Sequence, residues 1–253
     1  MTKNIEHEIE QIIIREMAAL NRSDLFRTPL VAFSSAHDKR YAELKEIVGE
    51  WHLRPDELLP EAKSVISYFV PFTKTVVSEP KNTEDAPPIW GEAYDIINSY
   101  FNHINETLSE YLSGLGFSSQ SIPATHTYDP KELKSMWSHR SAAAIAGLGT
   151  FGANRLLITE KGSGGRFGAL LTSAPLKVEQ KPASVKCLYV KNGSCDLCHK
   201  ICPVGALSHN GIERFVCHDE LSKNGKILRA RGNFEKADAC GKCISVCPVA
   251  YIE

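Results

Sequence analysis

All eight cysteines of this chain lie in its last third, and their spacing is regular. The first 186 residues contain none. Two segments repeat one another at a distance of 45 positions: Cys195-x₂-Cys198-x₃-Cys202-Pro203-Val204 and Cys240-x₂-Cys243-x₃-Cys247-Pro248-Val249. Thiolates are soft ligands that bind iron and zinc. In a chain that starts without a signal peptide, cysteines concentrated in this way indicate metal binding rather than disulfides.

The repeated spacing resembles that of bacterial two-cluster ferredoxins. Those proteins use the run C-x₂-C-x₂-C-x₃-C-P, whose fourth cysteine ligates the other cluster. Each repeat here keeps the last three cysteines of that run, and one further cysteine lies upstream of each. The pattern therefore predicts two [4Fe–4S] clusters that exchange one ligand. The first would be held by Cys187, Cys195, Cys198 and Cys247, and the second by Cys202, Cys217, Cys240 and Cys243.

Two alternatives to this ligand scheme stay open at the level of the sequence. Paired C-x₂-C units also occur in zinc ribbons, although zinc does not explain the two Cys-Pro ends. Cys187 or Cys217 could also be a buried thiol without a metal, since free cysteine packs as a small apolar residue.

The residues before the cysteines read as alternating helices and strands. Helical periodicity covers residues 1–20, 91–114 and 138–148, and β-branched and aromatic runs predict strands at residues 28–33, 62–70, 156–159 and 167–173. We expect an α+β protein with an α/β domain over residues 1–182 and a cysteine-rich domain over residues 183–253.

Composition narrows the class of protein. The chain has 253 residues, 43% of them hydrophobic, and a net charge of −1, which does not favour binding to nucleic acid or to an anionic membrane. Its first residues lack the basic start and apolar run of a signal peptide, and no stretch reaches the ~20 apolar residues of a membrane span. We therefore expect a cytoplasmic protein with no membrane or nucleic-acid partner.

A second resemblance covers roughly residues 55–253. The segment 139–159, with Arg140, Ala146-Gly-Leu-Gly149 and Asn154, is followed by Gly162-Ser-Gly-Gly165 and Ala169-Leu-Leu-Thr172. This order of motifs before the cysteines resembles epoxyqueuosine reductases and the related reductive dehalogenases. The resemblance implies a nitroreductase-like α/β domain that binds a cobalamin, followed by the ferredoxin-like domain. It also implies that the cofactor lies near Arg140, Gly147, Leu148, Gly149, Asn154, Gly162, Ser163 and Gly164.

The chain departs from the family pattern at the proton donor. Epoxyqueuosine reductases carry an aspartate seven positions before the arginine that matches Arg140, and this chain has Leu133 there. The helical-repeat tail that those enzymes use near tRNA does not follow the second repeat. We therefore expect a reaction other than epoxyqueuosine reduction, with Tyr128 and His139 as candidate catalytic residues.

Three functions fit these observations. The chain could be an oxidoreductase that passes electrons through the clusters to a corrinoid and reduces a small molecule. It could be a corrinoid reductase, with the corrinoid itself as substrate. The alternative is an electron-transfer protein without bound cobalamin. Each version needs a low-potential donor of the ferredoxin or flavodoxin type, and homodimers are common among nitroreductase-like domains.

Overall fold

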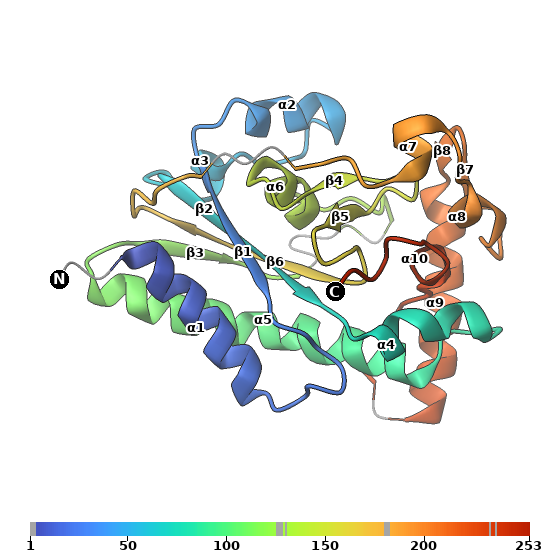
Figure 1. Cartoon of the computed structure of the whole chain (residues 1–253). Coiled ribbons are helices and arrows are strands. Elements are labelled where there is room, and N and C mark those ends of the chain that lie inside the picture. The colour runs from blue at the N-terminus through green and yellow to red at the C-terminus, as the bar shows by residue number, and fades with distance from the viewer. Residues whose placement is uncertain (1–3, 125–128, 130, 180–182, 233, 236) are drawn as a thin grey trace.

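The computed structural model describes most of the chain, namely residues 4–124, 129, 131–179, 183–232, 234, 235 and 237–253. Its centre is a four-stranded antiparallel sheet in the order β1-β2-β6-β3 (Figure 1). The strands are β1 (Leu30–Ser35), β2 (Ser64–Pro71), β3 (Ser119–Ile122) and β6 (Gly165–Thr172). The mixed α and β composition expected from the sequence is confirmed.

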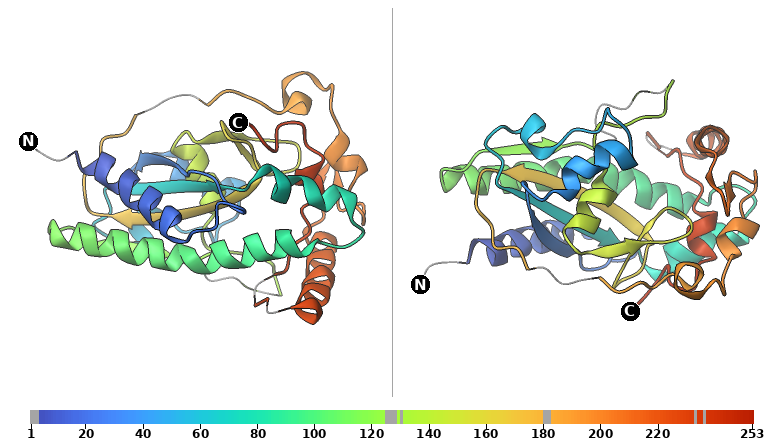
Figure 2. Two further views of the ribbon diagram at one scale, coloured as in Figure 1. Left: turned by 60° about the horizontal axis from the view of Figure 1, so that its bottom comes forward. Right: turned by 90° about the horizontal axis from the view of Figure 1, so that it is seen from above.

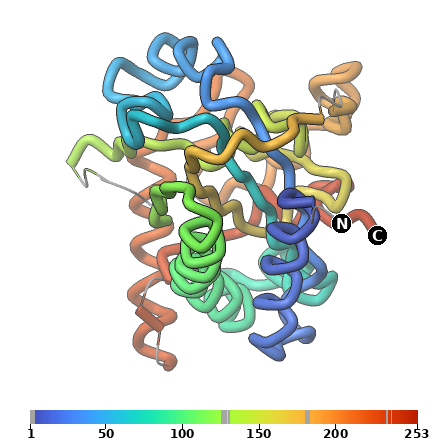
Figure 3. Tube along the Cα trace, turned by 90° about the vertical axis from the view of Figure 1, so that its left-hand side faces the viewer, coloured from blue at the N-terminus to red at the C-terminus, as the bar shows by residue number. Residues whose placement is uncertain are grey.

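The central strand β2 is buried along all eight of its residues because helices cover both faces of the sheet. On one face, Ile66, Tyr68 and Val70 pack against α1 (Ile5–Ala19) and the long α5 (Pro88–Gly114). Figure 3 shows these two helices side by side. On the other face, Val65 and Leu171 join a second core with α2 (Arg40–Ile47) and α6 (His139–Ile145).

The remaining elements are short and connect these layers. Before α5 lie α3 (Pro55–Leu58), α4 (Lys74–Ser78) and the 3₁₀ turn η1 (Glu79–Asn82). After α6, the chain forms a small hairpin of β4 (Gly149–Phe151) and β5 (Leu157–Thr159). The strands β4 and β3 and the helices α2, α3 and α4 were not among the predicted elements.

The cysteine-rich segment gathers at one end of the sheet (Figure 2). It consists of α7 (Leu188–Asn192), α8 (Leu197–Lys200), the hairpin β7 (Leu207–Ser208) and β8 (Gly211–Ile212), α9 (Arg214–Arg231) and α10 (Lys242–Ser245). The domain boundary predicted at 182/183 adjoins residues 180–182, which lie outside the described part, so it stays a prediction. No helix in the described residues is long and apolar enough to cross a bilayer.

Close contacts fix the cysteine-rich segment to the rest of the chain. Gly241 has φ +81°, and a Cβ at this position would lie 2.6 Å from the Trp90 ring, so only glycine fits. Beside it, the buried Lys242 ammonium donates to the carbonyl oxygens of Pro80 and Thr83. The second cysteine repeat is therefore held against residues that precede it by about 160 positions.

A buried histidine fixes the start of α6. The Nε2 atom of His52 accepts a hydrogen bond from the backbone N–H of Ser138, the N-cap of α6, at 3.1 Å. The His52 ring also stacks on Trp137, with 5.7 Å between ring centroids. Burial lowers the pKa of His52, and Lys45 lowers it further, against the opposing effects of Leu53 and Glu57. The imidazole is therefore neutral in the fold at neutral pH.

We expect His52 to make the protein less stable in mild acid. Below pH ~6.5, the unfolded chain binds a proton at this histidine before the folded protein does, so the free energy of unfolding falls until the folded pKa is reached. His52→Gln removes this titration and keeps an acceptor for Ser138. Its unfolding free energy should fall less between pH 7 and pH 5 than that of the wild type, by no more than ~1.4 kcal/mol per pH unit. The exposed His7→Gln should follow the wild type, and parallel urea-unfolding curves for His52→Gln and the wild type would contradict the assignment.

Candidate functional site

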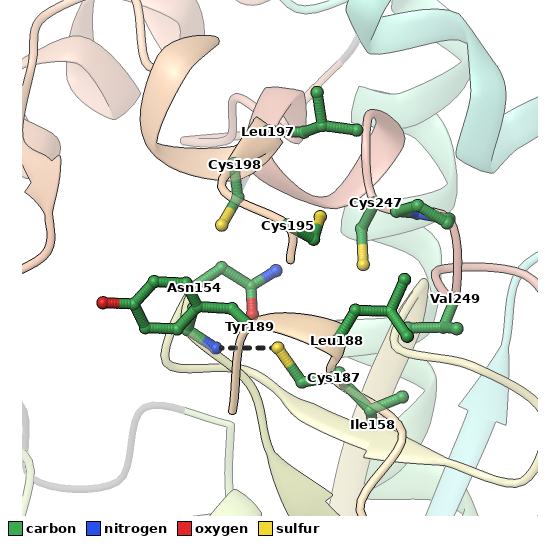
Figure 4. Close-up of a pocket in the computed structure, with 12 residues that line it drawn as sticks. Asn154, Ile158, Cys187, Leu188, Tyr189, Cys195, Leu197, Cys198, Cys247 and Val249 are labelled. Atoms are coloured by element: carbon green, nitrogen blue, oxygen red, sulfur yellow. Dashed lines mark hydrogen bonds between the residues drawn. The ribbon is translucent and has the colours of Figure 1, made fainter. Parts of the chain in front are cut away.

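Four of the eight cysteines line a single pocket in the cysteine-rich segment. They are Cys187 at the N-cap of α7, Cys195 just before α8, Cys198 within α8, and Cys247 just after α10. Figure 4 shows their sulfur atoms around a common space. Cys247 comes from the second repeat, so the chain brings together the four residues that the exchanged-ligand scheme assigned to one cluster.

Two thiols of this group have raised pKa values. Burial, and then the neighbouring Cys187, Cys198 and Cys195, raise the pKa of the Cys247 thiol to about 11. Burial, and then Cys187 and Cys195, raise the pKa of Cys198. The thiols of Cys198 and Cys247 therefore hold their protons at neutral pH unless a cation takes their place, because a buried thiolate beside other thiols is unfavourable.

The other four cysteines form a second group, which is recognised by the effect of its thiols on the pKa of their neighbours. Burial, and then Cys240 and Cys217, raise the pKa of the Cys243 thiol to about 12, with smaller contributions from Cys198 and Cys202. Burial and the nearby Cys240 and Cys202 raise the pKa of Cys217. Since Cys198 belongs to the first group and acts on Cys243, the two groups are adjacent.

The repeat in the sequence is also a repeat in local structure. In each repeat, the second cysteine of the C-x₂-C pair lies in a four-residue helix, α8 or α10. That helix ends before the Cys-Pro step. The two helices contact each other. Proline donates no hydrogen bond and fixes φ, so it ends each turn directly after the exchanged cysteine. Among the described side chains, no three histidine, cysteine or acidic residues converge as they would around a single metal ion.

The loop between β4 and β5 touches both cysteine groups. The backbone N–H of Ala153 donates to the Cys187 sulfur at 3.5 Å, as the dashed line in Figure 4 marks. The buried Asn154 side chain donates to the backbone carbonyl of Cys243 at 3.2 Å. Of the residues predicted to bind a cofactor, Asn154 therefore lies directly beside the cysteines.

Arg140, in the first turn of α6, lies near the second cysteine group. Surrounding protein atoms lower the pKa of its guanidinium, and Arg166 lowers it further while Tyr94 and Cys243 oppose the change. We call Arg140, Arg166 and Tyr94 the Arg140 cluster. The Arg140 guanidinium donates to the Arg155 carbonyl at 2.9 Å, which connects α6 to the β4–β5 loop.

Two residues of the Arg140 cluster were not predicted from the sequence. The Arg166 guanidinium lies 4.3 Å from the centre of the Tyr94 ring and donates to the Asn98 side chain at 3.1 Å. Tyr94 lies in the helix predicted over residues 91–114, and only its contact with a charged residue of β6 distinguishes it from a core tyrosine. That proximity depends on the packing of α5 against β6, which periodicity cannot show.

The other predicted cofactor residues lie elsewhere. Gly147 and Gly149, at the opposite end of α6 from Arg140, line a cavity of about 870 Å³ together with residues 37–40. Leu148 lies between them, half-buried. The backbone N–H groups of Ser163 and Gly164 both donate to the Ala250 carbonyl, and a Cβ at Gly162 would lie 2.2 Å from that oxygen. The structure thus divides the predicted set among three places.

The two candidate catalytic residues remain predictions. Tyr128 lies outside the described residues. The His139 Nε2 atom lies 3.2 Å from the Pro123 carbonyl oxygen, in the first turn of α6. Leu133, at the position of the family's aspartate, has φ +51° and is half-buried.

The curated proteins that match this chain include epoxyqueuosine reductases from several bacteria. Epoxyqueuosine reductase of Bacillus anthracis is 27% identical over 212 residues, which cover 79% of this chain and 51% of that protein. The enzyme of Listeria monocytogenes is 34% identical over 113 residues, or 43% and 28% of the two chains. The chain spans about half the length of the Bacillus anthracis and Bacillus subtilis relatives it matches. No family model matches the sequence.

Solved structures show the same likeness in the fold. An epoxyqueuosine reductase in complex with an epoxyqueuosine-modified tRNA stem loop has a TM-score of 0.60 at 20% identity, covering 99% of this chain and 68% of that one. A catabolic reductive dehalogenase in complex with 3-bromo-4-hydroxybenzoic acid has a TM-score of 0.60 at 16% identity, covering 87% and 30%.

These relatives overturn two predictions. The exclusion of epoxyqueuosine reduction is wrong, because the proteins named for that reaction match this chain. The exclusion of a nucleic-acid partner is wrong as well, because one structural neighbour is bound to a tRNA stem loop. Net charge and one missing aspartate were too weak to exclude either. The resemblance itself is confirmed: this chain is similar in sequence to epoxyqueuosine reductases and shares its fold with them and with a reductive dehalogenase.

Proposed function

We propose that this chain is an oxidoreductase of the epoxyqueuosine reductase type, which uses iron–sulfur clusters and a corrinoid to reduce epoxyqueuosine in tRNA. The observation that carries the proposal is the convergence of two cysteine groups on the β4–β5 loop, where Asn154 meets the Cys243 carbonyl and Ala153 meets the Cys187 sulfur. This convergence supports the proposal because clusters held by these cysteines would lie beside the sequence motif that resembles the family's cofactor site.

The two groups fit two [4Fe–4S] clusters, each with four thiolate ligands. Cys187, Cys195, Cys198 and Cys247 line one pocket, which accounts for the first set. The second set is supported by Cys217, Cys240 and Cys243, because the pKa of each is raised by burial and by neighbouring thiols that include Cys202. Because Cys198 and Cys243 are near each other, clusters bound at the two sets would be separated by a short path for electrons.

A corrinoid would lie where the residues that resemble the family's cofactor site come near the second cysteine group. Arg140 and Asn154 would hold the group there, since Cys243 lies near the Arg140 guanidinium and its carbonyl accepts from Asn154. When bound, a corrinoid supplies reducing chemistry at cobalt, whereas the protein provides binding, orientation and protons.

The proton for the reduction must come from a residue other than Leu133. Tyr94 belongs to the Arg140 cluster, and the Arg166 guanidinium lies 4.3 Å from the centre of its ring. A tyrosine hydroxyl can act as a general acid when it is within reach of the reacting atom. We therefore add Tyr94 to His139 and Tyr128 as a candidate proton donor.

Protein purified without oxygen, with and without added cobalamin, tests the proposed function. We expect about eight iron atoms per chain, as two [4Fe–4S] clusters require, and stoichiometric corrinoid after reconstitution. With a chemical reductant, the loaded protein should convert epoxyqueuosine in a tRNA stem loop to queuosine, measured by mass spectrometry of nucleoside digests. Iron without corrinoid uptake would leave an electron-transfer protein, and corrinoid uptake without conversion would exclude this substrate.

Exchange of one ligand between the clusters is tested by two single substitutions. Cys202→Ser should impair the cluster that includes Cys240 and Cys243, and Cys247→Ser should impair the one that includes Cys195 and Cys198. Each variant should lose up to about four iron atoms and keep the signal of the other cluster in electron paramagnetic resonance. Loss of the cluster in the same repeat as each substituted cysteine would refute the exchanged scheme.

The role of Tyr94 is tested by Tyr94→Phe, which keeps the ring beneath Arg166. We expect turnover to fall by about 10² or more, a typical contribution of a general acid, with unchanged iron and corrinoid content. Tyr111→Phe, on the same helix and also half-buried, should leave turnover unchanged. Full activity of Tyr94→Phe would assign the proton to another group.

A further inference from the structure

Exposed apolar side chains gather on the cysteine-rich segment. Among the described residues, twelve large apolar side chains are exposed, and eight of these lie between residues 185 and 216. Single exposed apolar residues are ordinary on a protein surface, but a concentrated set marks an interaction site.

Four of these residues and three aromatic rings form one surface, which we call the α7–α8 face. Its apolar members are Leu188, Val190, Leu197 and Ile212. The rings of Tyr189, His199 and His209 connect α7, α8 and the β7–β8 turn. Their centroids lie 4.5 to 5.4 Å apart, and the His209 Nδ1 atom and the Tyr189 hydroxyl are 2.9 Å apart. Figure 1 shows these elements side by side.

The α7–α8 face borders the first cysteine group. Leu188, Tyr189 and Leu197 belong to this face and also line the pocket of the four thiols (Figure 4). A protein that covers the face would therefore be separated from the four cysteine sulfur atoms only by these side chains.

The rim of the face is basic. Residues 186–214 carry four basic and two acidic side chains, in a chain whose net charge is −1. One of the two acids, Asp196, is already paired with Lys200 at 2.9 Å. The exposed Lys191 and Arg155 have no carboxylate partner among the described residues, and an Arg155 nitrogen would lie 3.3 Å from a Cβ at Gly211 in the β7–β8 turn. These free cations favour an acidic partner.

We propose that an acidic electron-carrying protein docks on the α7–α8 face and delivers electrons to the group held by Cys187, Cys195, Cys198 and Cys247. An apolar centre with a charged rim is the usual anatomy of a transient interface. In each encounter the carrier loses one electron and the bound iron gains it, and no covalent bond forms or breaks. The inference rests on the proposed function only in requiring reducible iron at these cysteines.

Stopped-flow kinetics with fully reduced, acidic flavodoxin as the probe test the docking site. Lys191→Glu and Val190→Glu should each lower the rate constant for iron reduction by about tenfold or more at low salt, since rim charges and apolar contacts set the encounter. Reduction by dithionite, which needs no docking, should stay within about twofold of the wild type. The matched controls Lys226→Glu and Ile47→Glu, exposed on α9 and α2, should behave as the wild type with both reductants.

Comparison of the two reductants distinguishes failure of the docking proposal from failure of the proposed function. Unchanged flavodoxin rates in both variants, or a wild type that only dithionite reduces, would overturn the docking site and leave the proposed function standing. A wild type that neither reductant reduces would overturn the proposed function as well. If light scattering shows that the wild type is a dimer which Val190→Glu dissociates, a second copy of the chain covers the face, and the docking proposal is wrong.

Discussion

The convergence of Cys247 with Cys187, Cys195 and Cys198 is the constraint on which the arrangement of this protein depends. Residues 60 positions apart must meet within one pocket, so the last residues of the described chain fold back over the first repeat. The same segment places the Ala250 carbonyl over the backbone N–H groups of Ser163 and Gly164. The glycines at this position, which the sequence suggests as part of a cofactor site, therefore allow the segment after the second repeat to pack closely against them.

The crowding of buried thiols makes this convergence unfavourable unless cations bind. Burial and neighbouring thiols raise the pKa values of Cys243 and Cys247 to about 12 and about 11, so eight thiolates cannot coexist here without cations. Iron bound at the proposed sites would replace those protons and link the two repeats through its thiolate ligands. The stability of the cysteine-rich segment would then depend on its metal content, as in other metal-dependent folds.

The sequence predicted the local features of this site and missed those that depend on packing. Spacing alone assigned the cysteines to two groups because the motif has a fixed geometry. Helical periodicity located α5 because it buries one regular face, and a run of β-branched and aromatic residues located β2, which is buried along its whole length. Neither could bring Tyr94 on α5 to Arg166 on β6, since that contact depends on how the helix lies across the sheet. The cofactor residues were predicted as one site because they are adjacent in sequence, yet α6 separates Arg140 from Gly147 and Gly149 by its whole length.

The β4–β5 loop connects the two ends of the proposed path of electrons. A nitrogen of its Arg155 would lie 3.3 Å from a Cβ at Gly211, its Ala153 donates to the Cys187 sulfur, and its Asn154 donates to the Cys243 carbonyl. The Arg155 carbonyl in turn accepts from Arg140. In the path that we propose, this loop would set the distance between the entry of electrons and the place where they are used, so that a shift of the loop would change both ends together.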